Sequence, residues 1–82
     1  MARKGRGGDP LEEFGRRLRE RRLELGLSQE ALAERAGLHR TYIGDVERGE
    51  RNIALVNIVR LSEALVVDPA ELVRGIGGRP TR

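Results

Sequence analysis

Apolar residues recur at helical spacing in five segments of this chain. In the first segment, residues 10–25, they lie three, four and seven positions apart, at Leu11, Phe14, Leu18 and Leu25, so that they share one face of a helix. Residues 29–36, 39–47, 55–65 and 69–74 form the other segments, and none of the five alternates apolar and polar residues as a half-buried strand does. The pattern predicts an all-α fold of five helices.

Start and stop signals delimit these helices. An aspartate followed by proline opens the first helix at Asp9 and the last at Asp68, and a glycine ends them at Gly26 and Gly75. Ala54, in contrast, is a weak cap for the fourth helix because its side chain accepts no hydrogen bond. In that fourth helix we expect the following residues to face largely inward: Leu55, Ile58, Val59, Leu61 and Leu65.

Residues 28–49 predict two short helices joined by a tight turn. Ser28 stands where a helix start needs a side-chain acceptor, and Gly37 reaches positive φ without steric cost. Ala33 is small where the second helix approaches. Residues expected to face inward are Leu32, Ala36, Leu38, Ile43 and Val46, and those left facing outward are Arg40, Thr41, Gly44 and Asp45. This is the arrangement of a helix-turn-helix, whose second helix enters the major groove of DNA.

The chain from Phe14 to Leu72 resembles the Xre family of bacterial and phage regulators, typified by the Cro and repressor proteins of lambdoid phages. Within that family, RTYI at residues 40–43, ERG at 47–49 and RN at 51–52 are similar to the controller proteins of restriction–modification systems. The resemblance implies a compact five-helix lambda-repressor-like DNA-binding domain with the helix-turn-helix at the second and third helices.

The resemblance also implies a structural ion pair between Arg22 and Glu47. In the phage repressors an arginine at the matching place pairs with the glutamate that ends the recognition helix. The alternative is an exposed Arg22 among the charges of residues 10–25, most of which we expect to form a solvated face with weak pairs between neighbouring turns.

Length and composition limit the organisation of the chain. Its 82 residues suffice for one domain, and with 38% hydrophobic and 2% aromatic residues its core must be small and aliphatic. We expect a flexible basic arm at residues 1–8, the helix-turn-helix domain at 9–75 and a flexible tail at 76–82. The arm is either a solvated tail or a segment that contacts DNA phosphates or a minor groove.

The net charge of +3 is unevenly distributed. Residues 1–8 contain three basic residues, whereas residues 9–74 hold 11 arginines against 13 aspartates and glutamates. The folded part is therefore not basic overall. If it binds DNA, its arginines must gather on one face, where they form fork-like contacts with phosphate and guanine.

Base contacts are expected from the recognition helix, where side chains near the helix start reach the base edges. Arg40 suits guanine through a bidentate pair, and Thr41 offers a methyl group to thymine or a hydroxyl to either base. Tyr42 either bonds a phosphate through its hydroxyl or packs its ring under the helix. Asp45 either accepts from cytosine or holds Arg40 or Arg48 in place.

Phosphate contacts are expected on both sides of that helix. Gln29 matches a glutamine that touches the backbone in the phage repressors, and it lies at a helix start whose N–H groups favour anions. His39, the only histidine, is either a cap or a neighbour of a phosphate. Residues that follow the recognition helix complete the predicted set: Arg48, Arg51 and Asn52.

The last part of the chain is more apolar than a small core needs. We expect the following residues to form a two-fold interface between copies, unless they serve ordinary packing of the last two helices: Val66, Val67, Val73 and Ile76. Controller proteins, which this chain resembles, pair through their last helices.

These features predict a homodimeric, sequence-specific transcriptional regulator on an inverted-repeat operator, with an autoregulating restriction–modification controller as the closest resemblance. The alternative is an antitoxin that binds its toxin and its own operator, and a third reading is a protein-interaction module without DNA contact. Double-stranded DNA is the expected partner, with RNA polymerase or a toxin as further candidates. We expect no enzymatic activity, no cofactor, no metal and no membrane association, and a cytoplasmic location, on the nucleoid when bound; the chain has no cysteine.

Overall fold

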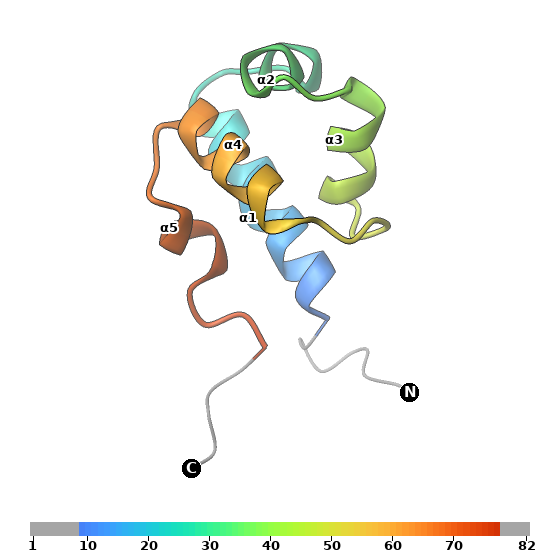
Figure 1. Ribbon diagram of the computed structural model, residues 1–82, viewed down its shortest axis with the longest axis vertical. Helices are drawn as coiled ribbons and strands as arrows, with labels where there is room; N and C mark the ends of the chain where they lie inside the picture. Colours follow the sequence, from blue (N-terminus) through green and yellow to red (C-terminus); the bar gives the residue numbers. More distant parts are fainter. Residues whose placement is uncertain (1–8, 78–82) are drawn as a thin grey trace.

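The computed structural model describes residues 9–77, and the predicted arm at 1–8 and residues 78–82 of the predicted tail lie outside the described residues. Five α-helices make up the described part, which contains no strand (Figure 1). Their bounds are α1 Pro10–Glu24, α2 Gln29–Ala36, α3 Arg40–Glu47, α4 Leu55–Leu65 and α5 Pro69–Val73. The predicted all-α, five-helix fold is therefore confirmed.

The helix ends follow the capping residues closely. Asp9 Oδ1 accepts from the backbone N–H of Leu11 at 2.9 Å, and Asp68 Oδ1 accepts from that of Ala70 at 2.8 Å. The third helix starts one residue later than predicted, because His39 has extended backbone angles and is the N-cap. Its side chain makes no capping hydrogen bond, and the His39 carbonyl accepts from the backbone N–H of Ile43 at 3.2 Å.

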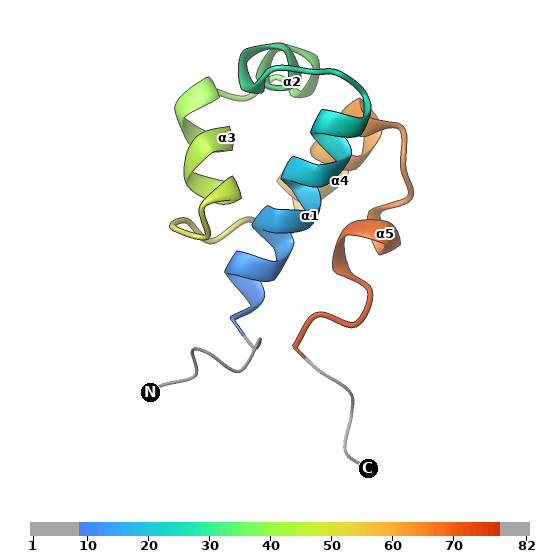
Figure 2. The same cartoon turned by 180° about the vertical axis from the view of Figure 1, so that it is seen from behind.

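The helices are arranged so that α3 lies at the edge of the molecule. In Figure 1 α4 crosses in front of α1, and Figure 2 shows the same crossing from behind. The recognition helix α3 packs against α1 and α2, while α5 packs against α1 and α4. One side of α3 therefore contacts the domain and the other is left free for a partner.

The core is aliphatic apart from one phenylalanine, as the composition predicts. Its members come from all five helices, so that each helix contributes to one shared cluster. Burying a leucine completely stabilises a fold by about 1.5–3 kcal/mol. The buried apolar residues are Phe14, Leu18, Leu32, Ala33, Ala36, Ile43, Val46, Leu61, Ala64, Leu65 and Leu72.

Three apolar residues predicted to face inward are exposed instead. Leu55 is 73% exposed, and Leu25 and Val59 are each 36% exposed. The buried face of α4 includes Ser62 and not Val59. The Ser62 side chain tolerates burial because its hydroxyl donates a hydrogen bond to the Val59 carbonyl at 2.9 Å. The expectation for α4 was wrong for Leu55 and Val59, because both faces of the first half of this helix are apolar and periodicity cannot choose between them; Leu61 and Leu65 are buried as expected.

Two glycines allow close contacts around α3. A Cβ atom on Gly15 would come within 2.5 Å of the Glu47 carbonyl oxygen and would also collide with that of Val46. Gly15 therefore lets α1 reach the end of α3. Gly44, predicted to face outward, is buried, and a Cβ there would lie 3.2 Å from Nη1 of Arg48 and 3.5 Å from Oε1 of Gln29.

Candidate nucleic-acid interface

A buried ion pair fixes the end of the recognition helix. Arg22 on α1 donates from Nε and Nη2 to the two carboxylate oxygens of Glu47 at 2.6 and 2.9 Å. The side chains are only 8% and 3% exposed. The hydrogen bonds to Glu47 raise the pKa of Arg22 against the opposing effect of burial, so the guanidinium stays protonated.

Two further hydrogen bonds extend this pair into α2. Arg22 Nη1 donates to the Leu27 carbonyl at 2.9 Å, and Gln29 Nε2 donates to Glu47 Oε1 at 3.0 Å. The network thus joins α1, the start of α2 and the end of α3. No buried side-chain nitrogen or oxygen in residues 9–77 lacks a hydrogen-bond partner, so the orientation of α3 is set by a fully satisfied polar network.

The first turn of α3 presents two exposed polar side chains. Arg40 and Thr41 are both exposed. Within residues 9–77 every salt bridge on this side involves other arginines, and none engages Arg40. The guanidinium of Arg40 therefore keeps its hydrogen-bond donors for a partner.

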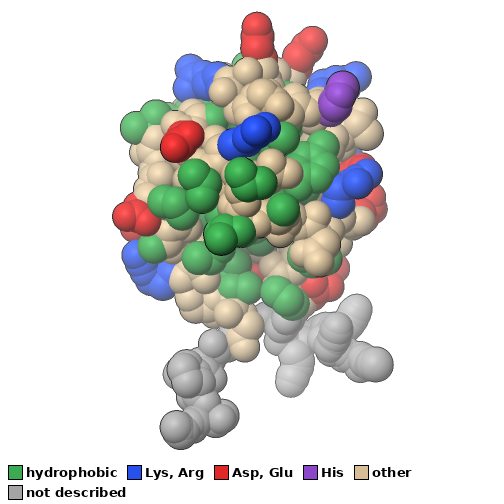
Figure 3. Space-filling model, viewed as in Figure 1, with side chains coloured by type: hydrophobic (Ala, Val, Ile, Leu, Met, Phe, Trp, Pro, Cys, Tyr) green, Lys and Arg blue, Asp and Glu red, His purple; other side chains and the backbone are tan. Residues whose placement is uncertain are grey.

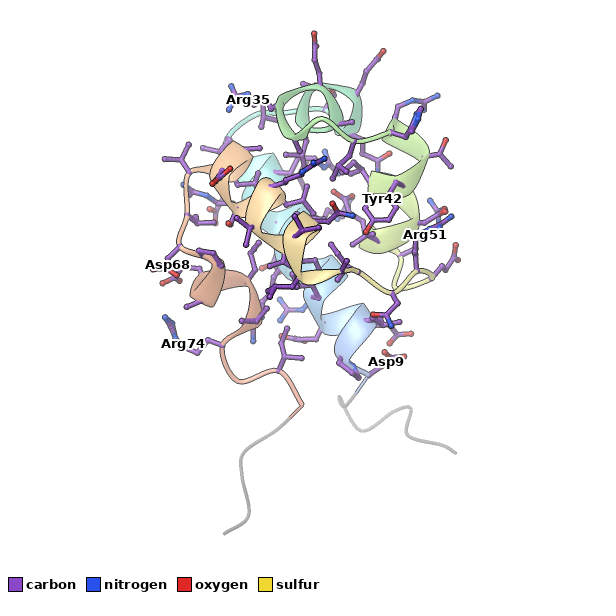
Figure 4. The ribbon with its side chains drawn as sticks, viewed as in Figure 1. Asp9, Arg35, Tyr42, Arg51, Asp68 and Arg74 are labelled. Atoms are coloured by element: carbon purple, nitrogen blue, oxygen red, sulfur yellow. The ribbon has the colours of Figure 1, made fainter. Side chains whose placement is uncertain are left out.

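Tyr42 packs its ring under the helix, which is one of the two alternatives drawn from the sequence. It is half-buried and its ring packs against the core. Its hydroxyl accepts from Nδ2 of Asn57 on α4 at 3.1 Å. The Arg51 guanidinium lies over the ring at 5.5 Å from the centroid, and Figure 4 shows the two side chains next to each other beside α3. This distance suits a cation–π interaction.

Asp45 holds two arginines, and Arg40 is not one of them. Its Oδ1 accepts from Arg48 Nη2 at 2.7 Å and its Oδ2 from Arg51 Nη2 at 3.2 Å. Arg48 also donates from Nε to Glu50 at 3.0 Å. The hydrogen bond to Glu50 and, to a smaller extent, the charge of Asp45 raise the pKa of Arg48.

The other predicted phosphate contacts lie around this cluster. Gln29 is half-buried and directed at Glu47, while His39 and Asn52 are exposed. Asn52 Oδ1 accepts from the neighbouring N–H of Ile53 at 2.8 Å, which leaves its amide group available for an acceptor such as phosphate.

This geometry is that of a known family. A family model described as helix-turn-helix matches residues 18–72. The chain belongs to the helix-turn-helix family. It is 51% identical over 61 residues to control protein C.BamHI of Bacillus amyloliquefaciens. The aligned region covers 73% of this chain and 75% of that protein.

Solved structures of this helix-turn-helix family agree with that assignment. The restriction–modification controller protein C.AhdI from Aeromonas hydrophila matches with a TM-score of 0.75 and 58% identity, over 76% of this chain and 94% of that one. The P22 c2 repressor, solved in complex with a synthetic operator, matches with a TM-score of 0.70 and 35% identity, over 76% of this chain and 94% of that one. The chain is therefore a DNA-binding transcription regulator and not an enzyme.

The predicted interface residues divide into two groups. Val66 and Val73 are 73% and 40% exposed, whereas Val67 and Ile76 are partly buried against the core. Val66 also adopts a left-handed conformation, with φ 58°, at the end of α4. Ordinary packing, the alternative drawn from the sequence, thus describes Val67 and Ile76.

Sequence reasoning missed an apolar surface at the start of α4. Hydrophobic side chains gather over α4 in the middle of the face shown in Figure 3. Leu55, Val56 and Val59 contribute to the exposed apolar area of α4, at 73%, 59% and 36% exposure. The signal available in the sequence was the apolar pair at 55–56, directly before the inward positions of the helix.

Two other kinds of site find no support in the described part. None of the helices in residues 9–77 is long and apolar enough to span a bilayer. Within the same residues, histidines and acidic side chains do not gather in a group that could hold a metal ion.

Proposed function

We propose that this regulator binds a specific inverted-repeat DNA sequence as a homodimer and acts as an autoregulating restriction–modification controller. Each copy would place α3 in the major groove of one half-site, with the half-sites about one helical turn, or roughly 34 Å, apart. The observation that carries this proposal is Arg40, which is exposed on the first turn of α3 and forms no salt bridge within residues 9–77, on a helix anchored by the buried Arg22–Glu47 pair.

Base recognition is assigned to the first turn of α3. Arg40 has both arms of its guanidinium available for guanine O6 and N7, and Thr41 beside it offers a methyl and a hydroxyl group. Tyr42 is a positioning residue in this proposal, because its ring and hydroxyl already contact Arg51 and Asn57. A rigid support of this kind keeps the angle of α3 in the groove constant.

Phosphate contact is assigned to polar residues on either side of α3. Arg51 and Asn52 follow the helix, and His39 precedes it. Gln29 contributes from the start of α2, and Arg48 contributes less than Arg51 because it is bound by two carboxylates. Contacts of this type position the protein and dominate its salt dependence.

We assign the pairing of two copies to the exposed apolar residues of α4 together with Val66 and Val73, which follow α4 in the chain. Contiguous exposed apolar residues mark protein interfaces, and this surface includes Leu55, Val56 and Val59. Val66 adds an independent argument, since a β-branched residue in the left-handed region is strained and here remains 73% exposed. The surface therefore combines the predicted Val66 and Val73 with three residues of α4.

The controller assignment is supported by the relatives. The curated relative C.BamHI is a control protein, and the solved structure of C.AhdI is a restriction–modification controller protein. The neighbouring genes provide a direct check. A methyltransferase gene and an endonuclease gene beside this one support the assignment, whereas an adjacent toxin gene contradicts it.

The experiment that tests the proposed function is selection of bound duplexes from a random DNA pool near physiological salt, followed by sequencing. An enriched inverted repeat, with a match upstream of the gene itself, is the expected result. Salt-sensitive binding without enrichment of any sequence would overturn the proposal, because it would leave only phosphate contact.

A further inference from the structure

Asp45 presents a negative charge on the helix that must approach DNA. In the free protein both of its carboxylate oxygens accept a hydrogen bond from an arginine, Arg48 at 2.7 Å and Arg51 at 3.2 Å. The Asp45 side chain is 21% exposed, while the two arginine side chains are 56% and 53% exposed. The carboxylate is thus covered by the groups that it holds.

The network around Asp45 has no net charge. Asp45 and Glu50 balance Arg48 and Arg51, and each arginine has a second contact: Arg48 with Glu50, and Arg51 with the ring of Tyr42. Both guanidinium groups are therefore held in place at the end of α3. Each still has unused N–H donors, because a guanidinium carries five.

We propose that Asp45 determines specificity without reading a base: it holds Arg48 and Arg51 in positions that suit phosphates only in the operator complex, and so weakens binding to other DNA. This inference rests on the proposed DNA-binding function. A base-reading role is disfavoured because a cytosine amino group would have to compete with the arginines at both oxygens.

The difference between operator and random DNA follows from the kind of binding in each case. Random DNA is bound almost entirely through phosphates, and a mobile arginine can follow the backbone in many docking positions. A held arginine fits phosphates in one docking position only. At the operator, the base contacts of Arg40 define that position, so holding the arginines has little unfavourable effect there.

The test compares four proteins that are first shown to fold by circular dichroism: the wild type, Asp45→Asn, Asp45→Glu and Glu50→Gln. Glu50→Gln is the matched control, because it makes the same change in net charge but leaves Asp45 with both arginines. Each protein is titrated with a pool of random duplexes and with the inverted repeat that the wild type selects, between about 50 and 200 mM salt.

We expect Asp45→Asn to bind the random pool about three- to tenfold more tightly, the scale of one or two exposed ion pairs, and the selected repeat no more tightly. Its salt slope on the random pool should steepen by about one unit. Glu50→Gln should change the ratio of the two affinities by less than about twofold, and Asp45→Glu, which keeps an acceptor, should restore the wild-type ratio within the same factor.

Two results would overturn this inference alone: Asp45→Asn behaving like Glu50→Gln, or Asp45→Asn losing preference at a single base pair, which would make Asp45 a base reader. A wild type that selects no sequence is a different failure, because it removes the proposed function on which the inference rests.

Discussion

Glu47, the last residue of the recognition helix, holds Arg22 of α1 through two hydrogen bonds of 2.6 and 2.9 Å in a position where both side chains are almost completely buried. The pair joins two helices through residues that are 25 positions apart along the chain. It therefore links the stability of the domain to the orientation of its DNA-binding surface.

Removing one partner of this pair is expected to destabilise the domain strongly. Glu47→Gln leaves the Arg22 charge buried without a counter-charge, which costs about 3–5 kcal/mol. Urea unfolding followed by circular dichroism measures the change. The double variant Arg22→Met with Glu47→Leu is the control, and it should be more stable than Glu47→Gln. A free energy of unfolding for Glu47→Gln within about 1 kcal/mol of the wild-type value would show that the pair contributes little to stability.

Gly15→Ala tests the close approach of α1 and α3. The added methyl group collides with the carbonyl oxygens of Val46 and Glu47, so we expect a loss of at least about 1–3 kcal/mol despite the higher helix propensity of alanine. Gly44→Ala is the matched control, because there the new atom meets the flexible end of Arg48. It should leave stability unchanged or raise it by up to about 1 kcal/mol. Equal thermal midpoints for the two variants would contradict this account.

Val66→Gly is expected to stabilise the monomeric domain. Valine at φ 58° is in the left-handed region, where a side chain costs roughly 1–2 kcal/mol that glycine avoids. Part of that gain is offset by the greater freedom of glycine in the unfolded chain, so the net change should be about 0.5–1 kcal/mol. Thermal unfolding at low protein concentration separates this effect from any loss at an interface. A lower midpoint would show that Val66 makes stabilising contacts within the monomer.

Arg40 and Arg51 are expected to respond differently to alanine substitution. Arg40→Ala should relax preference at one base position, with a loss of about 1–3 kcal/mol in discrimination. Arg51→Ala should weaken binding to the operator and to its single-base variants alike and lower the salt slope by about one unit. Titration of the selected repeat and of the same repeat with one base pair changed distinguishes them. An equal loss on both duplexes for Arg40→Ala would remove it from the base-reading residues.

The apolar surface of α4 predicts a specific assembly phenotype. Val56 is 59% exposed in one copy of the chain. Val56→Glu should convert a dimer to a monomer, as measured by light scattering, because pairing would bury the new charge. Leu23→Glu is the control, because Leu23 is also an exposed apolar residue, at 51%, but lies on α1. A wild type that is monomeric at micromolar concentration would exclude this surface as an interface.

The sequence by itself determined the five helices and their order. Caps such as Asp9 and Asp68, the turn residue Gly37 and the helical spacing of apolar residues act within a few positions, so local rules suffice to locate them. The exposed Arg40 and Thr41 followed from the same spacing, because they lie opposite the inward residues of α3.

Only the tertiary structure decided which contacts cross between elements. The sharing of Asp45 between Arg48 and Arg51, the bond from Asn57 to Tyr42 and the outward position of Leu55 depend on how α3, α4 and the loop between them meet in space. Periodicity describes one helix at a time, and an apolar or charged residue has several allowed partners until packing selects one. For that reason the sequence identified the recognition helix and offered Arg22–Glu47 and Asp45–Arg48 as candidate pairs, whereas only the fold decided which pairs form at its end.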